Sequence, residues 1–253
     1  MRPYLYLSTI VFCFFLFVSC NDSAMESKIE EVNPPAQGFN LADSDSLAIE
    51  IADAVMEAMG GRQTWYNTTY LKWNFFDARR HIWNKETNDI RMIGIRDTFD
   101  ISMNLDSLSG QVEWNGKTLS DPDSLAKYLQ MGKEMWINDS YWVFMPYKLK
   151  DSGVTLKYLG QDTMKTGTLA EVISLEFEKV GVTPQNKYHI YVDSTNLVKQ
   201  WDFYTNSSDS VARFTTPWMD YKTYGDIQLS SSRGPGYDIS ELAVGDSLSV
   251  YFE

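Results

Sequence analysis

The chain has 253 residues, a formal net charge of −12 at pH 7 and two cysteines, Cys13 and Cys20. A chain this acidic repels the phosphate backbone of nucleic acids and anionic lipid head groups, so we exclude nucleic acid as a partner. Eight Trp, fifteen Tyr and thirteen Phe supply enough apolar side chain for a large core without any disulfide.

The first twenty residues have the pattern of a secretory signal. Arg2 precedes an apolar run over 4–18, which is followed by Ser19 and Cys20. A bilayer-spanning helix needs about 20 apolar residues, so the shorter run here favours a cleaved signal over a transmembrane anchor.

The end of this run resembles the lipobox of bacterial lipoproteins, in the stretch Leu-Phe-Val-Ser-Cys over 16–20. One position departs from the family pattern, because Phe17 stands where a Leu is usual. The resemblance implies a signal peptide over 1–19, acylation of Cys20 and attachment to a membrane through that lipid. We expect a cell-envelope protein anchored to the outer membrane, on the periplasmic side.

Residues 21–42 are rich in Ser, Glu, Asn and Pro, which predicts a flexible tether over 20–42. The Asp and Ser residues at 43–46 are then N-cap candidates. An apolar residue recurs every fourth position until Gly60-Gly61, a pair that suits a helix C-terminus. This spacing predicts an amphipathic helix with the apolar face Leu47, Ile51, Val55 and Met59.

From Thr69 the apolar period changes to two, which predicts β-strands joined by short turns and therefore an antiparallel meander. The turn Asn115-Gly116 favours a hairpin, and Asp121-Pro122 suits the start of a second helix that carries an apolar stripe to Trp136. Residues 138–149 are dense in aromatics and are left unassigned. The predicted strands cover 71–75, 79–85, 90–96, 99–104, 112–114, 154–159, 169–179, 188–192, 197–204, 210–215, 227–229 and 248–252.

The hairpin over 188–201, Tyr-His-Ile-Tyr-Val-Asp-Ser-Thr-Asn-Leu-Val-Lys-Gln-Trp, resembles a hairpin of the LolA/LolB-like superfamily of periplasmic carriers and lipoproteins. Met59-Gly60-Gly61 and Trp65 are similar to the start of other envelope lipoproteins. The resemblance implies an α+β fold: a strongly curved antiparallel sheet, an incomplete β-barrel, with two main helices packed in or across its concave side. We expect one such domain over 43–253.

Side chains that could carry out catalysis are few. His81 and His189 lie within strand patterns, where a hydrogen-bonded sheet histidine is more common than a metal ligand or general base. Glu176 and Glu178 share one strand face, typical of a solvated sheet surface. Arg79, Arg80 and Arg91 could bind an anionic ligand or pair with the acidic surface. We predict no catalytic residues, no cofactor and no metal site.

The aromatic residues are the main candidate site. Periodicity directs nine of them inward, where they form either a solid core or the lining of a cavity for an acyl chain. The predicted function is therefore non-catalytic binding of a hydrophobic or amphiphilic ligand. The alternatives are a structural or protein-interaction lipoprotein without a small ligand, a hydrolase, or a glycan-binding surface of outward-facing rings. The nine candidate residues are Trp73, Phe75, Trp83, Phe99, Trp114, Trp136, Trp142, Trp201 and Phe203.

Overall fold

The structure is a computed structural model that describes residues 32–178 and 181–245. Over these ranges it contains three α-helices, one short 3-10 helix and fourteen β-strands. Every strand pairing is antiparallel, and no sheet of the described residues closes into a barrel, which confirms the predicted α+β fold class. The helices are α1 (Ser46–Ala58), α2 (Arg62–Asn67) and α3 (Pro122–Phe144), with the 3-10 helix η1 (Met145–Lys148) directly after α3.

The first sheet has seven strands in the order β14-β1-β2-β3-β4-β5-β6. Six of them form the predicted meander, and the β5–β6 turn has positive φ at Asn115 (51°) and Gly116 (72°), as such a hairpin requires. β14 was not predicted, and it pairs with β1 from the far end of the chain, with Leu71 opposite Val244. The strands are β1 (Tyr70–Phe75), β2 (Arg79–Asn84), β3 (Asp89–Gly94), β4 (Phe99–Asn104), β5 (Ser109–Trp114), β6 (Lys117–Thr118) and β14 (Ile239–Gly245).

The second sheet has five strands in the order β11-β10-β9-β8-β7, and β12 and β13 form a separate two-stranded sheet. The run expected over 210–215 becomes a strand only from Phe214, and the one expected over 248–252 lies outside the described residues. The strands are β7 (Val154–Thr163), β8 (Leu169–Phe177), β9 (Lys187–Val192), β10 (Val198–Tyr204), β11 (Phe214–Pro217), β12 (Met219–Tyr224) and β13 (Ile227–Ser232).

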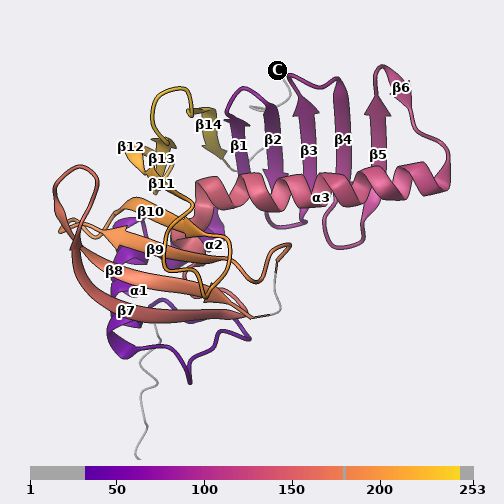
Figure 1. Ribbon diagram of the computed structural model, residues 1–253. Helices are drawn as coiled ribbons and strands as arrows, with labels where there is room; N and C mark the ends of the chain where they lie inside the picture. Colours follow the sequence, from indigo (N-terminus) through magenta and orange to yellow (C-terminus); the bar gives the residue numbers. More distant parts are fainter. Residues whose placement is uncertain (1–31, 179–180, 246–253) are drawn as a thin grey trace, which may run out of the picture. The chain divides into compact units, whose positions relative to one another are not determined.

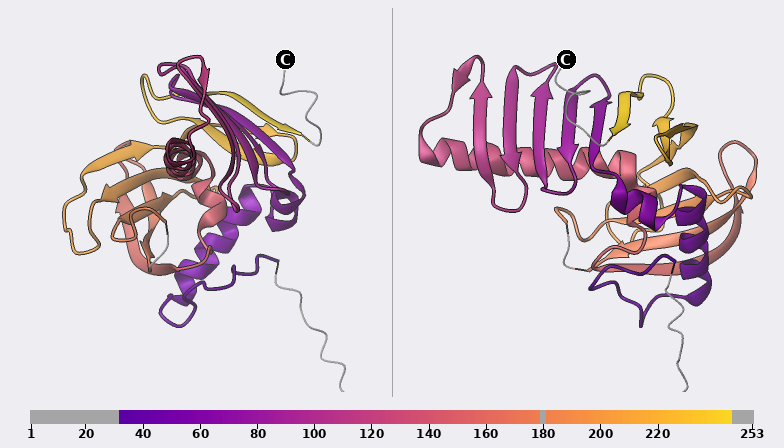
Figure 2. Two further views of the ribbon diagram at one scale, coloured as in Figure 1. Left: turned by 90° about the vertical axis from the view of Figure 1, so that its right-hand side faces the viewer. Right: turned by 180° about the vertical axis from the view of Figure 1, so that it is seen from behind.

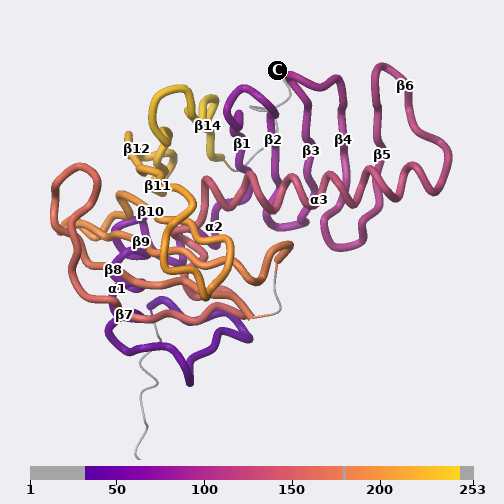
Figure 3. Tube along the Cα trace, in the orientation of Figure 1, coloured from indigo at the N-terminus to yellow at the C-terminus, as the bar shows by residue number. Residues whose placement is uncertain are grey.

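Helix α3 packs on both larger sheets. Its N-terminus has the predicted cap, because the Asp121 carboxylate accepts a hydrogen bond from the Ser124 amide at 2.9 Å. The helix continues past Trp136 to Phe144, so part of the unassigned aromatic segment is helical. It crosses the seven-stranded sheet (Figure 1), and the view along its axis shows the five-stranded sheet on its other side (Figure 2). The chain reaches the outer edge at β6 and returns along α3 (Figure 3).

The predicted apolar face of α1 is confirmed at Val55 and Met59, but in its first half Ala48 and Ala52 are buried in place of Leu47 and Ile51. Leu47 is 43% exposed. Small alanine side chains let the helix approach the sheet closely, and apolar spacing alone did not separate these two faces. The Asp45 side chain does not cap the helix as expected; it accepts a hydrogen bond from the Tyr158 amide of β7 at 3.0 Å.

The described part of the expected tether, residues 32–42, packs on the rest of the domain. The Ala36 amide donates to the Lys150 carbonyl at 2.9 Å, the Asn40 amide donates to the Val154 carbonyl at 3.0 Å, and Phe39 is buried. The chain from Val32 onward is one compact unit, distinct from residues 1–31. Because this unit contains its own core, we expect it to fold independently.

Candidate functional site

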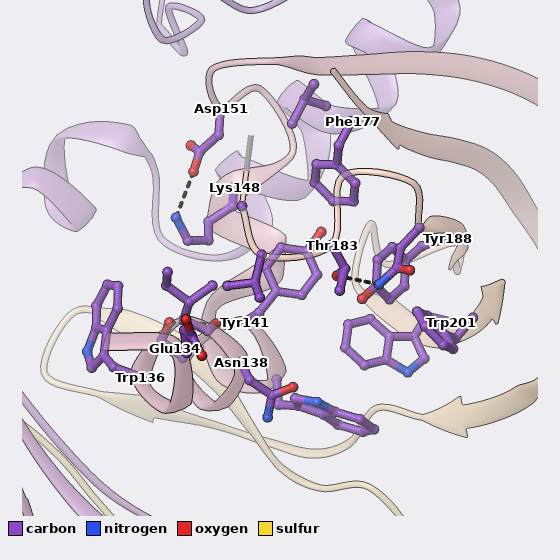
Figure 4. Close-up of a pocket in the computed structure, with 18 of the residues that line it drawn as sticks. Glu134, Trp136, Asn138, Tyr141, Lys148, Asp151, Phe177, Thr183, Tyr188 and Trp201 are labelled. Carbon is purple, nitrogen blue, oxygen red and sulfur yellow. Dashed lines mark hydrogen bonds and ion pairs between the residues drawn. The ribbon is translucent and has the colours of Figure 1, made fainter. Parts of the chain in front are cut away.

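A cavity of about 560 Å³ lies between α3 and the five-stranded sheet. Eight of its twenty lining residues are aromatic, and Figure 4 shows rings from the helix and from the strands converging on the same space. Small-molecule sites usually have volumes of about 300–1,000 Å³ and apolar linings with a few polar groups. The aromatic residues of the lining are Trp136, Tyr141, Trp142, Phe177, Tyr188, Trp201, Phe203 and Phe214.

Strand alternation places the rings of the sheet wall. Trp201 and Phe203 are two residues apart on β10, so both side chains point to one face of the sheet. Phe203 lies opposite Tyr188 of β9 on one side and opposite Phe214 of β11 on the other. The ring centroids of Phe203 are 5.2 Å from Tyr188 and 4.9 Å from Phe214. Three neighbouring strands thus build one continuous aromatic wall.

The opposite wall comes from the C-terminal half of α3. The Tyr141 ring is stacked on Trp201 at 5.9 Å between centroids and lies 5.4 Å from Tyr188. Trp142 meets Trp201 edge to face at 4.8 Å. These are preferred aromatic geometries, so they hold the helix against the sheet while leaving the remaining space open.

Three cavity-lining residues have unpaired polar atoms. Trp136 Nε1, Tyr141 Oη and Trp201 Nε1 are buried and have no hydrogen-bond partner among the described residues. Burial, with smaller effects from Tyr188 and Asp151, raises the pKa of the Tyr141 phenol well above its usual value, so this group stays neutral. A buried polar group without a partner costs about 1–3 kcal/mol. Trp73 Nε1 and Trp218 Nε1, which are not part of the lining, are unpaired in the same way, so such atoms also occur in the filled core.

Polar side chains of the lining come from α3, from η1 and the residues after it, and from the loop before β9. Lys148 of η1 and Asp151 form an ion pair of 2.7 Å, visible beside the rings in Figure 4. The Asn186 amide donates to the Thr183 hydroxyl at 2.6 Å. Glu134 also lines the cavity, and its carboxylate accepts a hydrogen bond from Gln130 at 2.8 Å.

The structure divides the nine predicted ligand-binding residues between two places. Four line the cavity, namely Trp136, Trp142, Trp201 and Phe203. The other five, Trp73, Phe75, Trp83, Phe99 and Trp114, pack on the side of the seven-stranded sheet and are not part of the lining.

The remaining cavity aromatics were missed as site residues. Tyr188 had been placed in a strand, and its alternation with Ile190 could have identified it. Tyr141 lies in the unassigned segment, and Phe177 and Phe214 lie in predicted strands to which no site role is assigned. A ligand-binding role stays a prediction for all of these residues.

His81 belongs to a buried polar cluster beneath α3. Its Nε2 lies 2.8 Å from Asp139 Oδ2, and Arg79 binds the same carboxylate with Nε at 2.7 Å and Nη2 at 2.9 Å. Burial lowers the pKa of His81 despite the opposing effect of Asp139. Nδ1 has no partner among the described residues, so a proton there would be a buried, unpaired donor. A neutral His81 that donates from Nε2 fits both observations.

The strand register brings Ser174, His189 and Asp202 onto three adjacent strands, the residue types of a hydrolytic triad. Their hydrogen bonds do not form one. Ser174 Oγ donates to Glu176 at 3.1 Å, His189 Nδ1 lies 3.0 Å from the Tyr204 hydroxyl, and Asp202 accepts from Tyr191 at 3.0 Å. A triad needs the nucleophile bonded to the base and the base to the acid. This face of the sheet therefore supports no hydrolase.

The three arginines considered as anion-binding residues have carboxylate partners instead. Arg79 pairs with Asp139, Arg80 with Glu241 and Arg91 with Asp100. Across the described residues, no cluster of three or more His, Cys, Asp or Glu side chains is arranged to hold a metal ion.

Arg233 is buried and has a structural role at the cavity. Its guanidinium stacks on Trp218 at 3.6 Å from the ring centroid and donates to the Trp142 carbonyl in the last turn of α3. Burial lowers the pKa of Arg233 to about 9. A cation at this position complements the negative end of the helix dipole and fixes the backbone of Trp142.

None of the helices in the described ranges has the length and apolar character needed to cross a bilayer.

Comparisons with known proteins give one distant likeness. No family model and no curated protein matches the chain. Among solved structures, a DUF1329 family protein from Desulfovibrio piger is similar to this chain, with a TM-score of 0.44 and 14% sequence identity over 81% of this chain and 97% of that one. A likeness at this level carries no functional argument, so the function must be inferred from the geometry of the cavity.

Proposed function

We propose that this protein is a cell-envelope lipoprotein that binds a hydrophobic or amphiphilic ligand, such as a lipid with an acyl chain, in the aromatic cavity and catalyses no reaction on it. The supporting observation is the cavity of about 560 Å³ with its wall of eight aromatic residues. Burying apolar surface contributes roughly 25 cal/mol per Å², so an acyl chain can bind without a fixed polar anchor. The resemblance of the 188–201 hairpin to LolA/LolB-like carriers is in keeping with this function.

The indole and phenol groups of Trp136, Tyr141 and Trp201 in the lining also suit an amphiphile. Rings that combine an apolar body with one polar atom suit an amphiphile, because each part of such a ligand finds a partner. The hydrogen bonds of Ser174, His189 and Asp202 supply no support for the hydrolase alternative.

The test uses the chain from Asn21 to Glu253, which includes the whole unit that begins at Val32. Native mass spectrometry should detect a co-purifying lipid, and an uncharged naphthylamine dye should bind saturably with quenching of Trp fluorescence. Phe203→Asp should abolish dye binding, because it places a charge in the aromatic wall. Leu169→Asp is the matched control, since Leu169 is 56% exposed and does not line the cavity. A protein free of lipid that takes up no dye would overturn the proposal.

Membrane attachment is tested separately. Residues 1–31 lie outside the described structure, so the role of Cys20 rests on its sequence context. Cys20→Ser should prevent lipidation and abolish labelling by a radioactive fatty acid, because no thiol remains to be acylated at the lipobox. Cys13→Ser is the control, since this residue lies in the predicted signal and should leave labelling intact. Unchanged labelling of Cys20→Ser would refute the lipobox assignment.

A further inference from the structure

The described lining of the cavity contains few charged side chains, so its net charge can be counted. Within the described part of the chain, Glu134, Lys148 and Asp151 are the acidic and basic side chains of the lining. Lys148 and Asp151 neutralise each other across 2.7 Å. Glu134 is hydrogen-bonded by the uncharged Gln130. The described lining residues therefore carry one uncompensated negative charge, that of Glu134, within a chain whose formal net charge is −12.

The one cationic side chain of the described lining already has a partner. An incoming carboxylate or phosphate would bind Lys148 beside Asp151, whose carboxylate already neutralises that ammonium group and would repel the second anion. The aromatic walls add to this effect, because the faces of indole and phenyl rings are negative and attract cations.

We propose that the cavity selects amphiphiles whose head group carries no net negative charge, so that uncharged and cationic heads bind while free carboxylates and phosphates are disfavoured. This inference rests on the proposed ligand-binding function and defines its ligand class. The ion pair of Lys148 with Asp151 acts as the selecting element, because it removes the anchor that an anionic head would use.

The test compares three single-chain ligands that share a dodecyl or dodecanoyl tail: dodecyltrimethylammonium, dodecyldimethylamine oxide and dodecanoate. Each is titrated below its micelle concentration against the uncharged naphthylamine dye bound to the chain from Asn21 to Glu253. Dodecanoate should displace the dye at least about fivefold less effectively than the other two, since its head group approaches the unbalanced carboxylate of Glu134 and the carboxylate of Asp151. The difference should shrink in about 0.5 M salt, which screens charges beyond a few Å.

Substitution at the ion pair gives the sharper test. Asp151→Asn releases Lys148 for a ligand carboxylate, so it should strengthen dodecanoate binding by about tenfold and weaken dodecyltrimethylammonium binding. Glu134→Gln should move both ligands in the same directions by a smaller factor, and it serves as the second variant if Asp151→Asn is unstable. Glu57→Gln is the matched control; it removes one negative charge from an exposed position of α1 that does not line the cavity.

The outcomes separate the two proposals. If the dye and all three ligands fail to bind, the carrier function itself is wrong. If all three bind with equal affinity, or if Asp151→Asn changes their order no more than Glu57→Gln does, the cavity binds amphiphiles without charge selection and only this inference is overturned. The expected order, together with its inversion in Asp151→Asn, supports both.

Discussion

The two faces of α3 differ in how completely the space beside them is filled. Toward the seven-stranded sheet, Ile101 and Met92 are fully buried, and Gly132 of the helix lies so close to β4 that an added Cβ would sit 3.2 Å from Ile101. Toward the five-stranded sheet, the aromatic rings of α3 and of the strands border a cavity of about 560 Å³. Aromatic content is thus not what makes a cavity. On the closed side, Gly132 lets α3 lie close to β4, and the ion pair of Asp139 with Arg79 joins the helix to β2.

The largest effect is expected where the ion pair holds the closed side together. Asp139→Ala leaves Arg79 and His81 without their shared carboxylate, and removing one partner of a buried pair typically costs about 3–5 kcal/mol. Urea unfolding at neutral pH measures this change. Arg80→Ala is the control, because Arg80 and Glu241 are 44% and 32% exposed and such pairs contribute at most about 1 kcal/mol. Equal losses in the two variants would mean that Asp139 does not hold α3 to β2.

A second comparison sets a core side chain against a cavity wall. Ile101→Ala should cost about 2–5 kcal/mol of folding free energy, since Ile101 is fully buried under α3, and should leave dye binding unchanged. Phe203→Ala should cost less, because Phe203 already borders open space, yet it should weaken dye binding. Thermal melts and dye titrations on the same two proteins measure both quantities. If Ile101→Ala weakened dye binding and Phe203→Ala did not, the distinction between the filled and the open face of α3 would be wrong.

Mild acid should loosen the closed side. The folded protein resists protonation of His81, whose pKa burial lowers below the usual value, whereas the unfolded chain takes up that proton below about pH 6.5. The unfolded state then binds more protons, so stability falls as pH decreases through this range. Burial alone would raise the pKa of Asp139, but hydrogen bonds from His81 and Arg79 hold that pKa below its usual value. Protonation of Asp139 at lower pH therefore removes further folding stability.

The measurement is the free energy of unfolding at about pH 7.5 and about pH 5.5. His81→Asn should reduce the decrease between these two values, because the group that titrates is gone. Burial and the nearby Lys187 also lower the pKa of the half-buried His189, so His189→Asn reports the share of the other histidine. If neither variant alters the pH dependence, the neutral His81 inferred from its hydrogen bonds is wrong.

Local features of the fold were predictable because short-range chemistry determines them. The Asn115-Gly116 turn, the Asp121 cap and the alternation of Phe99, Ile101 and Met103 on β4 all depend on residues a few positions apart. The pairing of β14 with β1 joins segments about 170 residues apart through backbone hydrogen bonds, which leave no local signal. Predicting β14 would have required knowing that it pairs with the distant strand β1.

The site could be predicted only in part for a related reason. Periodicity shows which side chains point inward, and it assigned Trp73 and Trp201 equally to an interior. It does not show what lies opposite. Trp73 meets His81 and Phe144 in a filled core, whereas Trp201 contacts Tyr141 and Trp142 and also borders the cavity. That difference arises from how α3 is placed between two sheets, which is a property of the tertiary fold.

The smallest effect, and the most direct comparison of a filled and an open environment, comes from two tyrosines near the end of α3. The Tyr147 hydroxyl donates to the Met59 carbonyl at 2.7 Å and lies 2.9 Å from the Gln228 carbonyl, whereas the Tyr141 hydroxyl has no partner among the described residues. Tyr147→Phe should therefore cost about 1 kcal/mol or somewhat more, because buried acceptors lose their donor. Tyr141→Phe should be neutral or slightly stabilising in the ligand-free protein, since it removes a buried polar atom that was unpaired.

Chemical denaturation of the two variants measures these changes in the free energy of unfolding. Repeating it with ligand bound distinguishes the two tyrosines further. With a dodecyl amphiphile present, Tyr141→Phe should lose stability relative to the unsubstituted chain if the hydroxyl meets the head group, because the stabilisation by ligand follows its affinity. Tyr147→Phe should show the same difference from the unsubstituted chain with and without ligand. A cost for Tyr141→Phe in the empty protein as large as that for Tyr147→Phe would show that the cavity wall is as fully satisfied as the core.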